Sequence, residues 1–134
     1  QFYQPKQNTS SSFDFGKNFA NNYNVPPSVL NSLQIACYDC HSNNTKYLWY
    51  DYIQPARMFV ENHIKNGKGE LNFYDFASYS NRKQQSNLEA ISKEIKSGDM
   101  PLNSYTLLHS ETNLKEEEKE VIFTWIDKTL NSKN

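Results

Sequence analysis

The sequence is poor in the features that mark several common classes of protein. Its 134 residues include only two cysteines, too few for a framework of disulfides or for a zinc site of four thiolates. Fourteen Lys and Arg residues and fifteen Asp and Glu residues give a net charge of −1, so the chain lacks the basic excess expected of a nucleic-acid-binding protein. It contains no run of about 18 apolar residues, so no segment of it is expected to span a membrane.

Aromatic residues, in contrast, are plentiful, at 14% of the chain. Nine Tyr, eight Phe and two Trp predict a packed interior or a bulky apolar ligand, because each aromatic side chain can bury a large apolar area. A length of 134 residues is that of one ordinary domain. We therefore expect a single folded domain whose aromatic residues line a core or a ligand site.

The N-terminal residues differ in composition from the rest of the chain. Residues 1–25 are rich in Asn, Ser and Gln, and the stretch from Asn8 to Ser12 has no apolar period. We interpret residues 1–25 as a flexible arm or tether and residues 26–134 as the folded domain. Such an arm would suit a spacer between the domain and an N-terminal membrane anchor that this chain does not include.

Helical periodicity recurs along the folded domain. Apolar residues at helical spacing predict helices over residues 53–66 and 81–97, each ended by glycine. A last helix is expected to follow a cap at Thr112 and Asn113. No segment alternates apolar and polar residues over the length of a strand. The pattern therefore predicts an all-α fold of four to five helices.

The motif Cys37-x-x-Cys40-His41 carries the clearest chemical signal in the chain. This spacing is the attachment signature of c-type haem. Residues three and four apart share one face of a helix, so both thiols can reach the two vinyl groups on one edge of a porphyrin. His41 then lies on the same side, where its imidazole can bind the iron as the proximal ligand.

Three other interpretations of the two cysteines are open at this point. A thioredoxin-like redox site would need a βαβ setting, for which the chain has no strand pattern. A zinc site would add two of the three histidines to the cysteine pair, from the set Cys37, Cys40, His41, His63 and His109. A plain structural disulfide is the third. Haem c is the favoured interpretation, because both cysteines of the chain stand in the motif.

The second axial ligand of a haem iron has four candidates. Met100 is favoured, because Pro101 holds it in an extended loop after a helix, from which it could reach under a flat ring. A Met ligand opposite His raises the reduction potential, which suits electron transfer. Met58 and His63 stand on the predicted helix 53–66, where Met58 is expected to fill core volume. His109 is the second choice of ligand, and an open coordination position is a further alternative.

The motif does not stand alone in the sequence. Over about residues 26–130 the chain resembles the small haem-binding-domain family of bacterial c-type cytochromes. The stretches that carry the resemblance are Cys37-Tyr38-Asp39-Cys40-His41-Ser42-Asn43, Tyr47-x-Trp49-Tyr50, Ile53-x-Pro55, Leu71-Asn72-Phe73, Gly98-x-Met100-Pro101-Leu102-x-Ser104-Tyr105 and Leu107-Leu108-His109. Leu48 departs from the pattern, since many relatives have Pro there, and this should affect only the turn after the motif.

The resemblance implies a mono-haem, mostly helical domain that is exported to the periplasm, behind a signal peptide or an N-terminal membrane anchor. It also implies that Cys37 and Cys40 form thioether bonds to the haem, that His41 is the proximal ligand, and that Met100 is the distal ligand.

Together these observations predict an all-α, cytochrome c-like bundle around one covalently attached haem c. The expected function is one-electron transfer between redox partner proteins in the bacterial periplasm, with no substrate chemistry and no nucleic-acid partner. We expect a monomer. The alternative function is a haem-based ligand-binding, sensor or peroxidase-like domain with a labile distal site.

Overall fold

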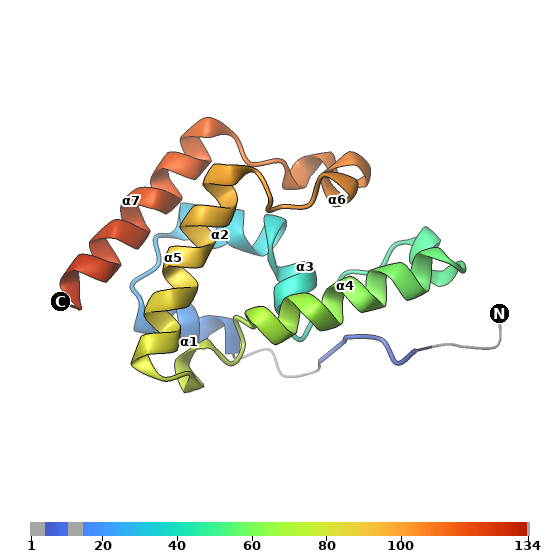
Figure 1. Cartoon of the computed structure of the whole chain (residues 1–134), viewed down its shortest axis with the longest axis horizontal. Coiled ribbons are helices and arrows are strands. Elements are labelled where there is room, and N and C mark those ends of the chain that lie inside the picture. The colour runs from blue at the N-terminus through green and yellow to red at the C-terminus, as the bar shows by residue number, and fades with distance from the viewer. Residues whose placement is uncertain (1–4, 11–14, 134) are drawn as a thin grey trace.

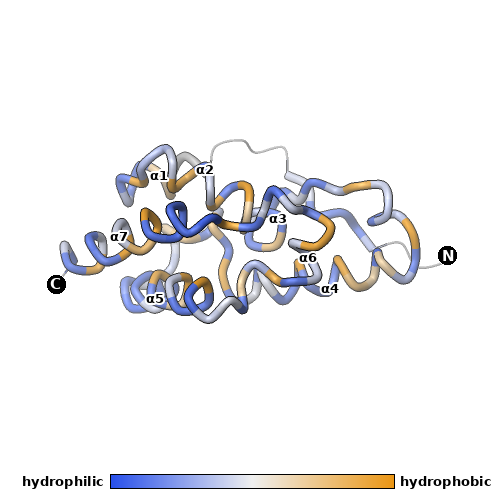
Figure 2. The backbone as a smooth tube through the Cα atoms, turned by 90° about the horizontal axis from the view of Figure 1, so that it is seen from above, coloured by the Kyte–Doolittle hydropathy of each residue, from blue (hydrophilic) through white to orange (hydrophobic). Residues whose placement is uncertain are grey.

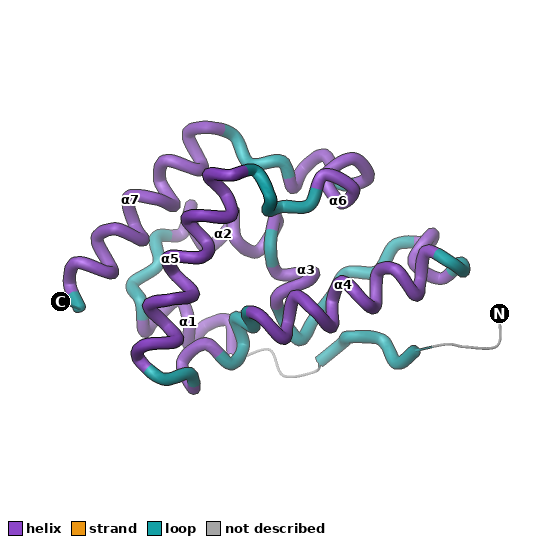
Figure 3. Tube along the Cα trace, viewed as in Figure 1, coloured by secondary structure: helices purple, strands orange, loops and turns teal. Residues whose placement is uncertain are grey.

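The structure is a computed structural model that describes residues 5–10 and 15–133. Seven α-helices and three 3-10 helices account for the regular structure of these residues, and they contain no strand (Figure 3). The elements are α1 (Phe15–Asn22), α2 (Pro27–Ala36), α3 (Tyr38–His41), η1 (Trp49–Tyr52), α4 (Ala56–Glu70), η2 (Phe76–Ser78), α5 (Asn81–Ser97), α6 (Asn103–Leu108), η3 (Ser110–Thr112) and α7 (Glu116–Ser132). The all-α prediction is confirmed, and the helices beyond the expected four to five include the short α1, α3 and α6.

The core lies where α2, α5 and α7 pack together at one end of the molecule, and α4 extends away from it toward the other end (Figure 1). Hydrophobic and hydrophilic residues intermingle along α5 and α7, as amphipathic helices require (Figure 2). The fully buried large side chains include Leu33, Phe73, Phe76, Leu88, Ile122 and Ile126. None of the described helices is both long and apolar enough to cross a bilayer.

Local signals explain where the two long C-terminal helices begin and end. The Ser80 side chain accepts a hydrogen bond from the Lys83 N–H at 3.2 Å and caps the start of α5. Gly98 ends α5 in the left-handed conformation, at φ 79°, which glycine adopts without steric cost. At the start of α7, the Glu118 carboxylate accepts from the Lys115 N–H at 2.8 Å. The bounds predicted for α5, residues 81–97, are confirmed.

Two predicted boundaries shift in the structure. The helix expected over residues 53–66 is α4, which runs on to Glu70 through both of its glycines. Glycine only weakens a helix, and here Gly67 packs closely against the neighbouring α3, so tertiary packing outweighs helix propensity. The last helix, α7, was expected to follow a cap at Thr112 and Asn113, but its N-cap is Lys115. Thr112 is instead the last residue of the short helix η3.

The interpretation of residues 1–25 as a flexible arm is corrected for the part that the structure describes. Residues 15–22 form α1, and Phe19, Tyr23 and Val25 belong to the hydrophobic core. The buried Trp125 indole donates to the Tyr23 carbonyl at 3.1 Å, which ties α7 to the end of α1. Residues 11–14, which include part of the polar stretch named above, lie outside the described residues.

Residues 5–10 also make specific contacts. The Asn8 amide donates to the Ser42 carbonyl and to the Thr45 hydroxyl, both at 2.8 Å, and the Lys68 ammonium donates to the Asn8 side-chain oxygen at 2.7 Å. The Thr45 N–H returns a hydrogen bond to the Asn8 carbonyl at 2.8 Å. This N-terminal segment is therefore fastened to the loop that follows α3 and to α4.

Candidate functional site

The motif residues lie at the junction of α2 and α3. Cys37 ends α2 and precedes α3, which contains Cys40 and His41. The His41 and Cys40 N–H groups donate to the Cys37 carbonyl at 3.0 and 3.3 Å, so the motif forms a single helical turn. Both cysteines are free thiols and half-buried. The turn gives the three side chains the common face that their spacing predicts.

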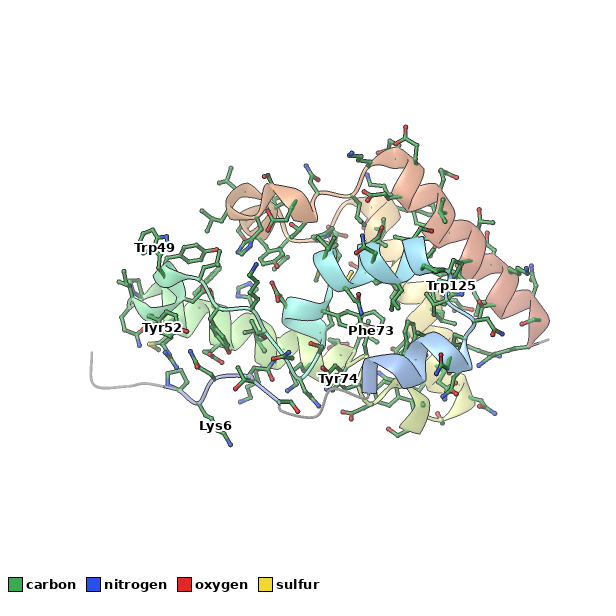
Figure 4. The ribbon with its side chains drawn as sticks, turned by 180° about the vertical axis from the view of Figure 1, so that it is seen from behind. Lys6, Trp49, Tyr52, Phe73, Tyr74 and Trp125 are labelled. Atoms are coloured by element: carbon green, nitrogen blue, oxygen red, sulfur yellow. The ribbon has the colours of Figure 1, made fainter. Side chains whose placement is uncertain are left out.

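A cavity of about 470 Å³ opens beside this turn. Its walls come from the motif, from α4, from one face of α5 and from the loop after α5. Cys37, Cys40, His41 and Met100 all line it, and much of the remaining wall is apolar: Ala36, Leu71, Phe73, Ile91, Ile95 and Leu102. In Figure 4, Phe73 lies in the interior beside α3. A concave, mostly apolar cavity of this size is typical of a cofactor site.

The imidazole of His41 is held by the backbone. Its Nδ1 lies 2.9 Å from the Leu71 carbonyl oxygen. A carbonyl only accepts, so Nδ1 carries the proton and Nε2 keeps its lone pair for a metal ion. The Phe73 N–H also donates to the His41 carbonyl at 2.8 Å, which fixes this residue at both its ring and its backbone.

Met100 reaches the same cavity from the loop after α5. The Asp99 and Met100 N–H groups both donate to the Glu94 carbonyl, at 3.1 and 3.2 Å, and this follows the reversal of the chain at Gly98. The Met100 side chain keeps 36% of its surface exposed. The structure thus brings together the four residues that the sequence analysis selected: Cys37, Cys40, His41 and Met100.

The other candidate ligands differ in where they lie. Met58 is 54% exposed on α4 and lines neither cavity, so its expected role in filling the core is wrong. His63 lines the 470 Å³ cavity, and its Nδ1 bonds to the Phe59 carbonyl at 2.8 Å, so its Nε2 is a candidate ligand besides Met100. The buried His109 bonds through Nε2 to the Tyr50 hydroxyl, so the nitrogen that would bind an iron already has a partner.

A second cavity of about 440 Å³ adjoins the first and shares Cys40, His63, Leu102 and Tyr105 with it. The Tyr105 hydroxyl donates to the Asp39 carboxylate, and its ring stacks on His109 at a centroid distance of 4.4 Å. Burial and the hydrogen bond to Asp39 raise the pKa of Tyr105 far above its usual range. Tyr105 therefore stays a neutral donor and fastens α6 to the motif.

Gly67 permits the close approach of α4 to the motif. A Cβ atom built on Gly67 would lie 2.8 Å from the Cys40 carbonyl oxygen and 3.4 Å from the Cys40 Cβ. The 2.8 Å distance is shorter than a Cβ contact can be, so a residue without a side chain is needed where α4 crosses α3. The cradle of the motif turn therefore depends on this one glycine.

Comparison with known proteins identifies the family. A model of the haem-binding domain matches residues 1–128. The chain belongs to this family. No curated protein and no solved structure matches the sequence.

The residues of this haem-binding domain fit the cofactor. The cavity offers two thiols, an oriented histidine nitrogen and a methionine sulfur, in a mostly apolar wall suited to a porphyrin. It also offers a buried amide: the Asn87 Nδ2 has no hydrogen-bond partner within the protein. A buried donor without a partner among the described residues needs an acceptor from water or from a bound group.

The arrangement of side chains in the part of the chain that the structure describes does not favour the zinc alternative for this haem-binding domain. Burial, reinforced by the neighbouring Cys40, raises the pKa of Cys37 to about 12. Burial, reinforced by Asp39, raises the pKa of Cys40 to about 11. These groups are therefore neutral thiols at neutral pH when no metal ion is bound. Within residues 5–10 and 15–133, no group of three His, Cys, Asp or Glu side chains could hold a metal ion.

Two residues of the haem-binding domain's site were not selected from the sequence. Tyr105 ends one of the stretches that carry the family resemblance, but nothing local to it predicts its bond to Asp39 across 66 positions. Asn87 did carry a signal, because it stands four residues before Ile91 on the apolar face of α5. A polar residue within an apolar stripe marks either a buried hydrogen bond or a ligand contact.

Proposed function

We propose that this haem-binding domain is a mono-haem c-type cytochrome that carries single electrons. Cys37 and Cys40 attach the haem covalently, while His41 and Met100 bind its iron. The observation that supports this proposal best is that these four side chains line one mostly apolar cavity, although His41 and Met100 lie 59 positions apart in the sequence.

Covalent attachment would join each thiol to one vinyl group of the haem. Each S–H would add across one vinyl C=C bond, with the sulfur bonded to one carbon and the hydrogen to the other, so that no atom would leave. Cys37 and Cys40 stand one helical turn apart, which matches two vinyl groups on one edge of the porphyrin. Gly67 leaves room for the backbone of Cys40 beside α4.

When bound, the haem supplies an iron that accepts and donates one electron. The protein's part is to orient the ligands and to exclude water. The Leu71 carbonyl holds the His41 ring so that its Nε2 is available, and such an outer hydrogen bond also makes the ligand more basic. The second ligand, Met100, raises the potential and leaves the iron no position for small molecules.

This role requires no substrate. We propose that the domain is a monomer that exchanges electrons with redox partner proteins in the bacterial periplasm, as its resemblance to exported c-type cytochromes suggests. The competing role, a sensor or peroxidase-like domain, would need a vacant or labile iron position. Met100 lines the cavity, whereas His109 lies outside it and its Nε2 bonds to Tyr50, so a filled second position through Met100 is favoured over ligation by His109.

Optical spectroscopy of the full chain, matured in a host that attaches c-type haem, tests the proposal. Covalent haem should survive denaturing electrophoresis, and the pyridine haemochrome should show c-type bands. A weak far-red band in the oxidised protein should report the bond between Met100 sulfur and iron. A c-type haemochrome without that band, together with rapid carbon monoxide binding, would favour the sensor role. Haem that is lost on denaturation would refute covalent attachment.

A further inference from the structure

Asn87 is the feature of the cavity that the proposed function does not use. It stands on α5 and only 6% of its surface is exposed. Its Nδ2 has no hydrogen-bond partner, although the residue lines the 470 Å³ cavity. A buried donor left unpaired costs about 1–3 kcal/mol, so a partner inside the cavity would restore that stability.

The position of Asn87 along α5 narrows the choice of partner. Asn87 and Glu94 are seven residues apart, which is about 10 Å along a helix axis. The Glu94 carbonyl holds the N–H of Met100, so the methionine is fastened at the other end of this wall. A thioether sulfur is in any case a weak acceptor. The partner of Asn87 is therefore a different group from the Met100 sulfur.

The charges around the cavity further limit which group can be the hydrogen-bond partner of Asn87. Among the described residues no Lys or Arg lines the cavity, and its ionisable wall residues include His63 and two carboxylates, Glu70 and Glu94. The strong hydrogen-bond acceptors of a haem are the two carboxylates of its propionate groups. A carboxylate taken out of water needs donors, and the Asn87 amide is a buried donor of this wall that has no partner among the described residues. Asn66 also offers an amide, but it is exposed and can pair with water.

We propose that Asn87 is a haem-binding residue whose Nδ2–H donates to a propionate carboxylate. The inference rests on the proposed function for the covalent placement of the haem. The amide neutralises no charge, so it compensates the anion only through its dipole. Without the Asn87 amide, the negative charge of the propionate is less compensated at the iron, and this favours the ferric state.

The test compares the wild-type holoprotein with Asn87→Leu, which has no donor, and with Asn87→Ala, which also lacks a donor and demands no extra volume. Ser92→Ala is the control, since Ser92 is buried on the same helix but does not line the cavity. We expect both Asn87 variants to lower the reduction potential and to shift the propionate bending band in the resonance Raman spectrum. The control should change neither property.

Three results would overturn the inference. Unchanged potential and propionate band would mean that the amide has another partner. Loss of the far-red band in both variants would assign Asn87 to the Met100 sulfur instead. No haem bound to the wild-type protein would refute both proposals. If haem binds without thioether bonds, only the proposal of covalent attachment fails. Asn87→Ala should then raise the Kd for haem. An unchanged Kd would contradict the inference.

Discussion

Gly67 and Cys40 lie so close that a Cβ atom on the glycine would stand 2.8 Å from the cysteine carbonyl oxygen. The carbonyl belongs to the backbone of the motif turn, so it cannot move aside as a flexible side chain would. The crossing of α4 over α3 therefore controls the position of the Cys40 backbone and, with it, the position of the Cys40 thiol.

Gly67→Ala should destabilise the protein. Overpacking costs roughly 1–3 kcal/mol, more than the 0.5–1 kcal/mol or so that alanine gains over glycine in a helix. We expect a lower thermal unfolding midpoint and less covalent haem per chain, measured by differential scanning calorimetry and by the pyridine haemochrome.

Gly69→Ala is the matched control, two residues away on the same helix. A Cβ atom there would meet nothing within 4 Å. This variant should gain about 0.5–1 kcal/mol from helix propensity and keep its haem content. Equal effects of the two substitutions would contradict the close approach of α4 to Cys40.

Phe19→Ala tests whether α1 belongs to the core. The Phe19 side chain is 1% exposed, and its ring makes edge-on contacts with Phe73 and Phe76 at 5.0 Å. Truncating a buried phenylalanine costs about 3–5 kcal/mol. Chemical denaturation should show this loss. Leu107→Ala, at an 83% exposed position, should change stability by no more than about 0.5 kcal/mol. A flexible N-terminal arm would make the two variants alike.

The sequence predicted the elements whose signals are local. The bounds of α5 follow from Ser80, Gly98 and an apolar stripe between them, and the motif residues follow from their spacing. The spacing of Phe15, Phe19 and Tyr23, four residues apart, is a helical signal that the polar composition of the segment obscured. The burial of Phe19 could not be predicted, because its partner Phe73 lies more than 50 positions away. The same limit applies to Asn8, whose partners include Lys68.

Asn8→Ala should loosen the loop that follows the motif. The side chain makes three hydrogen bonds, with Ser42, Thr45 and Lys68. Their loss should cost about 1–3 kcal/mol, since each net contribution is near 1 kcal/mol. Hydrogen exchange at the Thr45 amide should become faster, because this N–H bonds to the Asn8 carbonyl at 2.8 Å.

The next amide along the chain supplies the internal control. The Lys46 N–H donates to the Asp39 carboxylate at 3.0 Å, so this hydrogen bond does not involve Asn8. Its exchange rate should rise less than that of Thr45. If both amides keep their wild-type protection, the N-terminal segment does not support this loop.

The stability of the protein should fall at alkaline pH, partly through Tyr47. Burial, together with the hydrogen bond to Glu61, raises the pKa of Tyr47 to about 12 from an ordinary value of 10.0. Between these values the unfolded chain loses the proton and the folded protein keeps it, so the free energy of unfolding decreases as pH rises. Tyr47→Phe should make this decrease shallower between about pH 10 and 12. Tyr52→Phe, at a half-exposed tyrosine, should leave the slope nearer to that of the wild type.

Met100→Ala tests the second axial ligand. The variant should lose the far-red band, show a lower reduction potential and bind carbon monoxide in the ferrous state, because a coordination position becomes free. Met58→Ala is the control: Met58 is the other methionine of the chain, 54% exposed and outside both cavities. It should keep the wild-type spectrum and potential. A Met100 variant with an unchanged potential and no carbon monoxide binding would mean that another side chain holds the iron. His63, which lines both cavities, would then be the next residue to replace, since the His109 Nε2 already bonds to Tyr50.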